Sequence, residues 1–100
     1  MDPAIEDCTV SDVVVSTAGR DAGSLYYVVG VQDVFLLLAD GKGRTLENPK
    51  RKKRKHAKPV LRSETRVAAK LRCGDKVLNS ELRRDLAFLS RELQANNLGG

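Results

Sequence analysis

The sequence predicts a small, mainly β barrel of about five short strands followed by a helical extension, which makes the chain α+β overall. Two observations lead to this fold class. Between residues 13 and 61, short runs of β-branched, aromatic and aliphatic residues alternate with glycine-containing turns, a pattern typical of short antiparallel strands. From residue 63 onward, apolar residues recur every three or four positions, which is the period of a helix.

The first predicted element is a β-hairpin. The runs on either side of residues 18–23, with the first strand expected over residues 13–16, suit a pleated and partly buried surface. Three residues of the connecting segment favour turns, because glycine tolerates a positive φ and aspartate can bond its own backbone two residues on: Gly19, Asp21 and Gly23. We expect a hairpin whose loop presents Arg20 to solvent.

The second and third strands differ in pattern. Apolar residues alternate along the second, expected over residues 25–31, and one set is predicted to face the barrel interior: Leu25, Tyr27, Val29 and Val31. The third, over residues 34–39, is apolar on both faces, and such a strand needs cover on both sides. We expect the barrel interior to cover one face and a later helix the other.

A second turn follows the third strand. Asp40 and Gly41 form one of the strongest local hairpin signals, and Lys42-Gly43-Arg44 keeps the turn polar and basic. Residues 44–46 are expected to return as a short strand, which the proline at position 49 ends. A last strand over residues 56–61 would close the sheet, and five such strands with tight turns describe a small SH3-like barrel.

The first hairpin also resembles a known motif. Ala18-Gly19-Arg20-Asp21-Ala22-Gly23 followed by Tyr26-Tyr27-Val28-Val29 is similar to the KOW motif. That motif consists of a hydrophobic strand, a short loop with a basic residue, an alanine or lysine before a fixed glycine, and an apolar strand. The likeness extends through the lysine-rich run and the helical part to stand-alone bacterial RNA-binding KOW proteins, relatives of KOW barrels in archaeal and eukaryotic large-subunit ribosomal proteins. It implies an SH3-like barrel whose loop 18–23 contacts folded RNA or protein. Ala22 stands where many members have lysine, so one loop charge is missing.

Positive charge is concentrated in one window. The formal net charge is +5, yet residues 42–66 hold eleven Lys and Arg against two Glu and carry +9, so the other residues sum to −4. The partner is therefore expected to be anionic. The predicted RNA contacts are the cations of the two loops and of the basic run: Arg20, Lys42, Arg44, Lys50, Arg51, Lys52, Lys53, Arg54, Lys55 and Lys58.

The basic loop over residues 49–59 contains six adjacent cations, at positions 50–55. Adjacent cations repel one another, so we expect this loop to stay extended and solvated until it meets a polyanion. Neutralising about six phosphates would give log K against log salt a slope of roughly −4 to −5. Three alternatives to RNA binding remain for this loop: it is solvated and has no partner, it is a nuclear import signal, or it binds an anionic membrane surface. Tyr26 could stack on unpaired bases, although a core position is its alternative.

Two helices are predicted after the barrel. Ser63 is the expected N-cap of the first and Gly74 its left-handed end, while Asn79 is expected to cap the second, with Glu81 in its first turn. The second helix carries one apolar stripe, formed by Leu82, Leu86, Leu89 and Leu93. We expect this stripe to pack on the outer face of the strand over residues 34–39. A dimer seam or a partner helix is the alternative.

The sequence favours binding over catalysis. His56, the single histidine, lies in the basic run, and no acid–base pair, activated nucleophile or metal-ligand cluster has a recognisable spacing. Residues 41–45 lack the glycine spacing and the helix of a phosphate loop. Cys8 and Cys73 match no metal site and are expected to be reduced hydrophobes, a disulfide or redox role being the alternative. We therefore expect no enzyme, cofactor or metal.

These observations define the predicted organisation: an N-terminal lead-in over residues 1–12, the barrel over 13–62 and a helical extension over 63–100. The acidic N-terminus and the lack of a long apolar run favour a cytoplasmic protein, and we expect a monomer. The predicted function is binding of structured RNA, with ribosomal RNA of the large subunit as the leading candidate. The alternative is a protein-interaction module in a transcription or translation complex.

Overall fold

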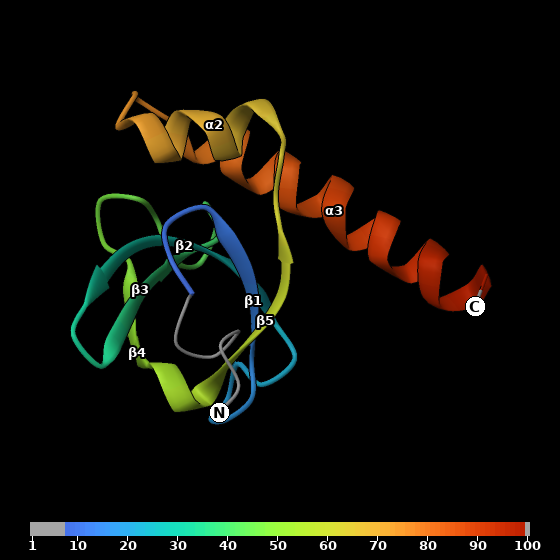
Figure 1. Cartoon of the computed structure of the whole chain (residues 1–100), viewed down its shortest axis with the longest axis horizontal. Helices are drawn as coiled ribbons and strands as arrows, with labels where there is room; N and C mark the ends of the chain where they lie inside the picture. The colour runs from blue at the N-terminus through green and yellow to red at the C-terminus, as the bar shows by residue number, and fades with distance from the viewer. Residues whose placement is uncertain (1–7, 100) are drawn as a thin grey trace.

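A computed structural model describes residues 8–99, with side chains through residue 95. This range forms a five-stranded antiparallel sheet followed by two helices (Figure 1). The elements are β1 (Asp12–Ser16), β2 (Leu25–Gln32), β3 (Phe35–Ala39), β4 (Lys50–Lys53), the 3₁₀ turn η1 (Arg54–His56), β5 (Ala57–Arg62), α2 (Arg66–Cys73) and α3 (Asn79–Gly99). The order in the sheet is β4-β3-β2-β1-β5. Of the predicted lead-in, residues 1–7 lie outside the described residues.

The first predicted hairpin is confirmed. β1 and β2 pair antiparallel, with Val13 opposite Tyr27. Their loop ends at Gly23, whose φ is +93° and whose N–H donates to the carbonyl oxygen of Ser16 at 2.8 Å. A positive φ of this kind strains any residue with a Cβ, so glycine is required here.

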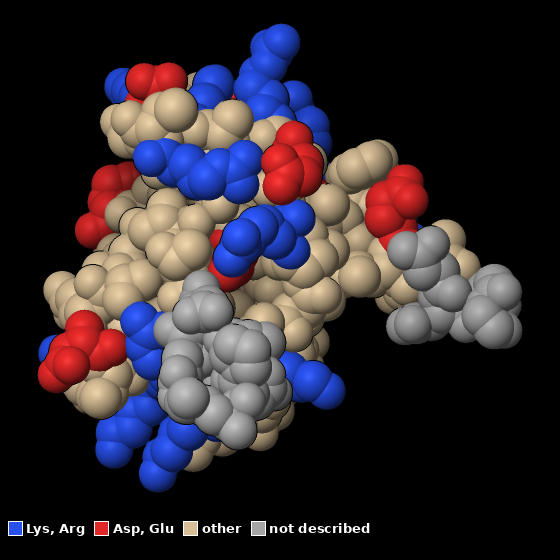
Figure 2. Space-filling view, viewed as in Figure 1, with Lys and Arg blue, Asp and Glu red and all other residues tan. Residues whose placement is uncertain are grey.

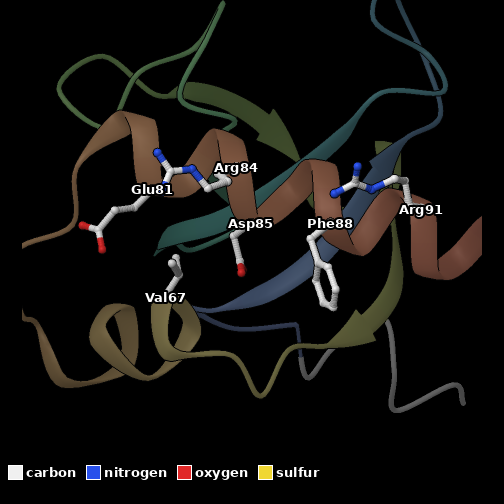
Figure 3. A pocket seen from close by; sticks show the side chains of 6 residues that line it. All are labelled: Val67, Glu81, Arg84, Asp85, Phe88 and Arg91. Carbon is white, nitrogen blue, oxygen red and sulfur yellow. The ribbon is translucent and has the colours of Figure 1, made fainter.

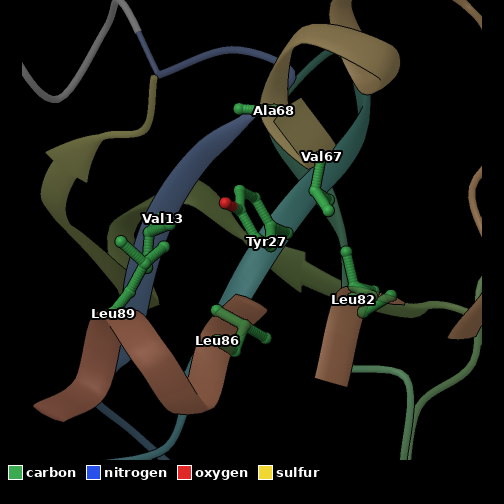
Figure 4. Close-up of a cluster of buried hydrophobic side chains, with 8 residues drawn as sticks. Val13, Tyr27, Val67, Ala68, Leu82, Leu86 and Leu89 are labelled. Atoms are coloured by element: carbon green, nitrogen blue, oxygen red, sulfur yellow. The ribbon is translucent and has the colours of Figure 1, made fainter. Parts of the chain in front are cut away.

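The predicted alternation along β2 holds from Leu25 to Val28 and is then interrupted by a bulge between Val28 and Gly30. The assignment of faces is wrong for the residues before the bulge. Three of the residues expected inside the barrel, Leu25, Tyr27 and Val29, pack on the side of the helices instead. The cluster on that side consists of Val13, Tyr27, Ala39, Val67, Ala68, Leu82, Leu86 and Leu89 (Figure 4). The opposite face of the sheet carries a second cluster: Cys8, Val14, Tyr26, Val28, Leu36, Leu38 and Ala57. Beyond the bulge, Val31 lies opposite Leu36, a member of the second cluster, and therefore on that face, where it is 39% exposed. A period of two separates the faces of a strand without saying which face a helix will cover.

The predicted strand over residues 44–46 is absent from the structure, and the chain there forms a loop. The Asp40 side chain holds this loop in its turn, because its Oδ1 accepts the N–H groups of Lys42 and Arg44, both at 2.9 Å. Leu46 gives its N–H to the Oδ1 of Asn79 at 2.8 Å rather than to a strand. The fourth strand begins only at Lys50.

The basic run is not a solvated loop, which corrects the prediction for residues 49–59. Its first half is β4, which pairs with β3 so that Leu36 lies opposite Lys52. Its second half is η1 and the start of β5, which pairs with β1. Successive strand residues point to opposite faces, so β4 divides its four adjacent cations between two sides of the sheet and lowers their repulsion. The predicted last strand is present as β5, paired with β1 at one end of the sheet order.

The helices begin at other residues than predicted. The N-cap of α2 is Thr65, whose hydroxyl accepts the N–H of Ala68 at 3.2 Å; the predicted cap, Ser63, is buried beneath it. Gly74 ends α2 with φ +77°, as predicted. Asn79 is the first residue of α3, and its side chain contacts the β3–β4 loop instead of capping the helix.

The leucine stripe of α3 packs within this chain, but mainly on β1 and β2 rather than on the predicted strand, β3. Leu82, Leu86 and Leu89 are buried against a cluster that includes Val13 of β1 and Tyr27 of β2, and β3 contributes only Ala39 to it. Leu93 is partly exposed. A polar contact fastens the same interface, since the Tyr27 hydroxyl is hydrogen-bonded to the Asp85 carboxylate of α3. Burial, and then this hydrogen bond, raise the pKa of Tyr27 to about 12.

Candidate nucleic-acid interface

Three of the predicted contact residues surround one cleft. Arg20 comes from the β1–β2 loop, Arg44 from the β3–β4 loop and Lys50 from the first position of β4. The two loops meet because β1 and β3 run in the same direction and end at the same edge of the sheet. We call this space the loop cleft; its volume is about 570 Å³ and its lining is Arg20, Asp21, Ser24, Tyr26, Gly43, Arg44 and Lys50.

Asp21 organises the inner wall of the loop cleft. Its carboxylate accepts the Nζ of Lys50 at 2.6 Å and the Nζ of Lys52 at 2.9 Å. The hydroxyls of Ser16 and Tyr26 also donate to it, at 3.0 and 3.1 Å. One acidic side chain thereby ties the first loop to the basic strand.

The charge state of Asp21 follows from these contacts. Burial alone would raise the pKa of this carboxyl, but the hydrogen bonds from Lys50, Lys52, Ser16 and Tyr26 outweigh burial and hold the pKa well below its ordinary value. Asp21 is therefore ionised at neutral pH and partly neutralises two cations of β4. The sequence marked Asp21 only as a turn residue, because its partners lie 29 and 31 positions away.

Lys52 belongs to the interior of the sheet. The residue is 8% exposed, and its Nζ donates to Ser16 Oγ at 2.7 Å, to the Ala18 carbonyl oxygen at 2.7 Å and to Asp21. An ammonium group has three N–H donors, so all of them are used. We therefore leave Lys52 out of the proposed binding surface.

The other side of β4 faces solvent. Arg51 is exposed and its guanidinium lies 4.0 Å from the ring centroid of Phe35, a cation–π contact. Lys53, Lys55 and Lys58 are exposed as well. In Figure 2, Lys and Arg side chains project from the end of the molecule where η1 lies, and others surround α2.

The guanidinium group of Arg54, in η1, donates hydrogen bonds to backbone carbonyl groups of other segments. Its Nε donates to the carbonyl oxygen of Asp33 at 3.0 Å, and one of its terminal nitrogens donates to that of Cys8 at 3.1 Å. Arg54 therefore links η1 both to the β2–β3 turn and to the segment before β1. The structure gives this predicted contact residue a bridging role within the fold.

Lys42 lies on a neighbouring surface, where α3 supports the β3–β4 loop. It lines a groove of about 290 Å³ together with Arg83 of α3. Gly41 is buried against the helix: a Cβ at this position would lie 2.2 Å from the carbonyl oxygen of Asn79, and Arg83 donates to the Gly41 carbonyl oxygen at 3.3 Å. The Asn79 amide also donates to Glu47, at 2.6 Å. The first turn of α3 thus fixes the loop that carries two predicted contacts.

Tyr26 is unavailable for stacking on a base. It is 5% exposed, and its hydroxyl is held by Asp21. Tyr26 therefore occupies a core position, which was the alternative considered for this residue.

The sequence did not identify Asn79 and Arg83 as residues that hold the β3–β4 loop. The local pattern of a helix does not show which distant segment the helix will contact.

The described residues include both cysteines of the chain. Cys8 is buried, with its pKa raised to about 11 by burial and by the nearby Asp12, while Cys73 is exposed, and both are free thiols. Within residues 8–99, no group of three or more His, Cys, Asp or Glu could hold a metal ion, and neither helix there is both long and apolar enough to cross a membrane. No family model matches the sequence, and no curated protein matches it significantly.

Proposed function

We propose that this protein binds structured RNA through the loop cleft and the cations beside it. The observation that carries the proposal is the meeting of Arg20, Arg44 and Lys50, from three separate segments, around one cleft. Cations at fixed positions suit the phosphate backbone of a folded RNA, since phosphate contacts set the orientation of a protein on nucleic acid. Ribosomal RNA of the large subunit, in the cytoplasm, is the proposed target.

The proposal includes an SH3-like barrel of the KOW type. Its support is the strand order β4-β3-β2-β1-β5, with a 3₁₀ turn between β4 and β5, and the reach of Lys52 from β4 to Ser16 at the end of β1. That contact joins strands that are not neighbours in the sheet, as a strongly curved sheet allows. The resemblance of loop 18–23 to the KOW motif agrees with this fold.

The mechanism is electrostatic. Arg20, Arg44 and Lys50 would take about three phosphates in the loop cleft, which corresponds to a salt slope of roughly −2 to −3. The exposed cations Arg51, Lys53, Lys55 and Lys58 would add contacts where the RNA extends over β4 and η1. Asp21 keeps Lys50 in place before RNA arrives, so the cleft loses little side-chain freedom on binding.

Co-sedimentation tests this function. A lysate at low salt is separated on a sucrose gradient, and the wild-type protein is expected with the large ribosomal subunit. The double variant R20A/R44A is expected near the top, while R66A/K76A, which removes two exposed cations elsewhere, sediments like the wild type. A wild-type protein that stays at the top, away from every RNA-containing particle, contradicts the proposal.

One observation favours the second candidate, a protein-interaction module in a transcription or translation complex. The β2–β3 turn exposes Val34, with 53% of its surface accessible, close to the partly buried Phe35 and its Arg51. An apolar residue beside an arginine–aromatic pair is typical of protein interfaces. RNase treatment before the gradient distinguishes the two functions, because an assembly held by protein contacts survives it.

A further inference from the structure

A second groove lies between the two helices, away from the loop cleft. Its volume is about 390 Å³, and its lining is Val67, Glu81, Arg84, Asp85, Phe88 and Arg91 (Figure 3). Val67 comes from α2 and the other five from α3. In Figure 3, Asp85 and Phe88 project from the same side of α3, toward the side on which α2 lies.

Phe88 is the unusual residue of this groove. The chain has four aromatic residues, and all four lie in the described range. Tyr26 and Tyr27 are buried and Phe35 is covered by Arg51, whereas Phe88 is 47% exposed. Its ring is the aromatic surface that this protein offers to a flat ligand.

The charges beside Phe88 favour an anionic ligand. Arg84 and Arg91, both exposed, lie four residues before and three residues after Phe88, hence on the neighbouring turns of the same helix face. Each carboxylate of the groove already has a partner inside the protein. Glu81 accepts the Nζ of Lys70 at 2.9 Å, and Asp85 is bonded to Tyr27 and to Thr65, the latter at 2.8 Å. With Lys70 included, the groove carries a surplus of one positive charge.

We propose that this groove binds one unpaired nucleotide of the RNA. The base stacks on the Phe88 ring, and the adjoining phosphates lie near Arg84 and Arg91. An exposed ring between cations is the arrangement with which proteins hold single-stranded nucleic acid, because every base has a face that stacks. The inference rests on the proposed RNA binding and deepens it, since the target becomes a folded RNA with an unpaired base next to a helical segment.

A tryptophan reporter tests the stacking directly. The chain contains no tryptophan, so the variant F88W carries a single indole, whose fluorescence falls when a base stacks on it. We expect strong quenching by an RNA hairpin with an adenosine loop and little by the same RNA as a perfect duplex. The control L78W places the indole at another exposed apolar position, where Leu78 is 52% exposed, and its fluorescence should stay constant.

Affinity measurements on the same hairpin complete the test. F88A is expected to weaken binding roughly 5- to 150-fold, the range that stacking of a base on an aromatic ring contributes, with no loss for L78A. Unfolding should be nearly unchanged in both variants, because both side chains are exposed. Wild-type binding without any quenching of F88W, or equal quenching by hairpin and duplex, overturns the nucleotide site and leaves the RNA function intact. Absence of any wild-type binding overturns the proposed function itself.

Discussion

The two sides of strand β4 use the same residue types for different purposes. On the inner side, Lys50 and Lys52 are bonded to Asp21, and Lys52 is buried with all its donors used. On the outer side, Arg51 and Lys53 are exposed. Lys52 and Lys53 are neighbours in the sequence, yet one supports the fold and the other faces solvent.

Adjacent cations of a basic run can therefore have different roles in the fold. A strand sends alternate side chains to opposite faces, so about half of its cations turn toward the interior when the strand joins a sheet. Those cations need an anion from the protein itself, because an unpaired buried charge is costly. Here Asp21 supplies it, because its carboxylate bonds both Lys50 and Lys52.

The largest effect on stability is expected when Lys52 and Lys53 are replaced by alanine in separate variants. Lys52→Ala leaves Asp21 and the buried polar groups around it without their shared donor, and we expect a loss of about 3 kcal/mol in the free energy of unfolding. Lys53→Ala should change it by less than about 0.5 kcal/mol. Urea unfolding of both variants measures the difference. If Lys52→Ala and Lys53→Ala have similar free energies of unfolding, the two sides of β4 do not differ in their contribution to stability.

Removing the negative charge of Asp21 tests the same comparison, because Asp21 is the counter-charge of Lys50 and Lys52. Asp21→Asn should cost about 2 kcal/mol at neutral pH, since two cations lose their counter-charge. The pKa of Asp21 is lowered in the fold from its ordinary 3.8, so its stabilisation is present above about pH 4 and is lost as the pH falls below it. In unfolding measured against pH, the wild type should therefore lose more stability below pH 4 than the variant. Parallel curves would exclude Asp21 as the responsible group.

A second pair of near neighbours extends the comparison to the β3–β4 loop. Gly41 has φ +78° and no room for a Cβ beside Asn79, whereas a Cβ at Gly43 would meet nothing within 4 Å. Gly41→Ala should cost about 2 kcal/mol of stability, and Gly43→Ala much less. Thermal unfolding provides the measurement. A Gly41→Ala protein as stable as Gly43→Ala would mean that α3 does not fix the loop.

The smallest effect on stability, but a clear one on binding, is expected on the outer side of β4. The variant R51A/K53A should unfold within about 1 kcal/mol of the wild type, because its side chains are exposed. Its salt slope for RNA binding should fall in magnitude by about 1 for each phosphate that the variant no longer neutralises. Fluorescence anisotropy with a labelled ribosomal RNA fragment measures the slope. An unchanged slope would restrict the interface to the loop cleft.

Much of the fold follows from local pattern. The first three strands, the last strand, the first hairpin and the left-handed end at Gly74 depend on neighbouring residues, which the sequence displays directly. The face of β2 that the helices cover depends on where α3 docks, and the docking depends on contacts such as Tyr27 with Asp85, 58 residues apart. No periodicity reports such a contact.

The candidate site was predictable in its residue types but not in its arrangement. The cations of the two loops and of the basic run are visible as charge, and Arg20, Arg44 and Lys50 do meet in space. The burial of Lys52 was not predictable, because it requires Asp21, Ser16 and Ala18 from a segment more than 30 residues earlier. Charge density alone therefore overstated how many cations of the run face solvent.

The salt dependence of RNA affinity tests the central proposal most directly. We expect R20A/R44A to bind a ribosomal RNA fragment more weakly and to reduce the magnitude of the slope of log K against log salt by about 2. The variant R66A/K76A, with the same net charge, should retain the wild-type affinity and slope. Equal losses in both double variants would mean that net charge rather than the loop cleft attracts the RNA, and would contradict the proposed site.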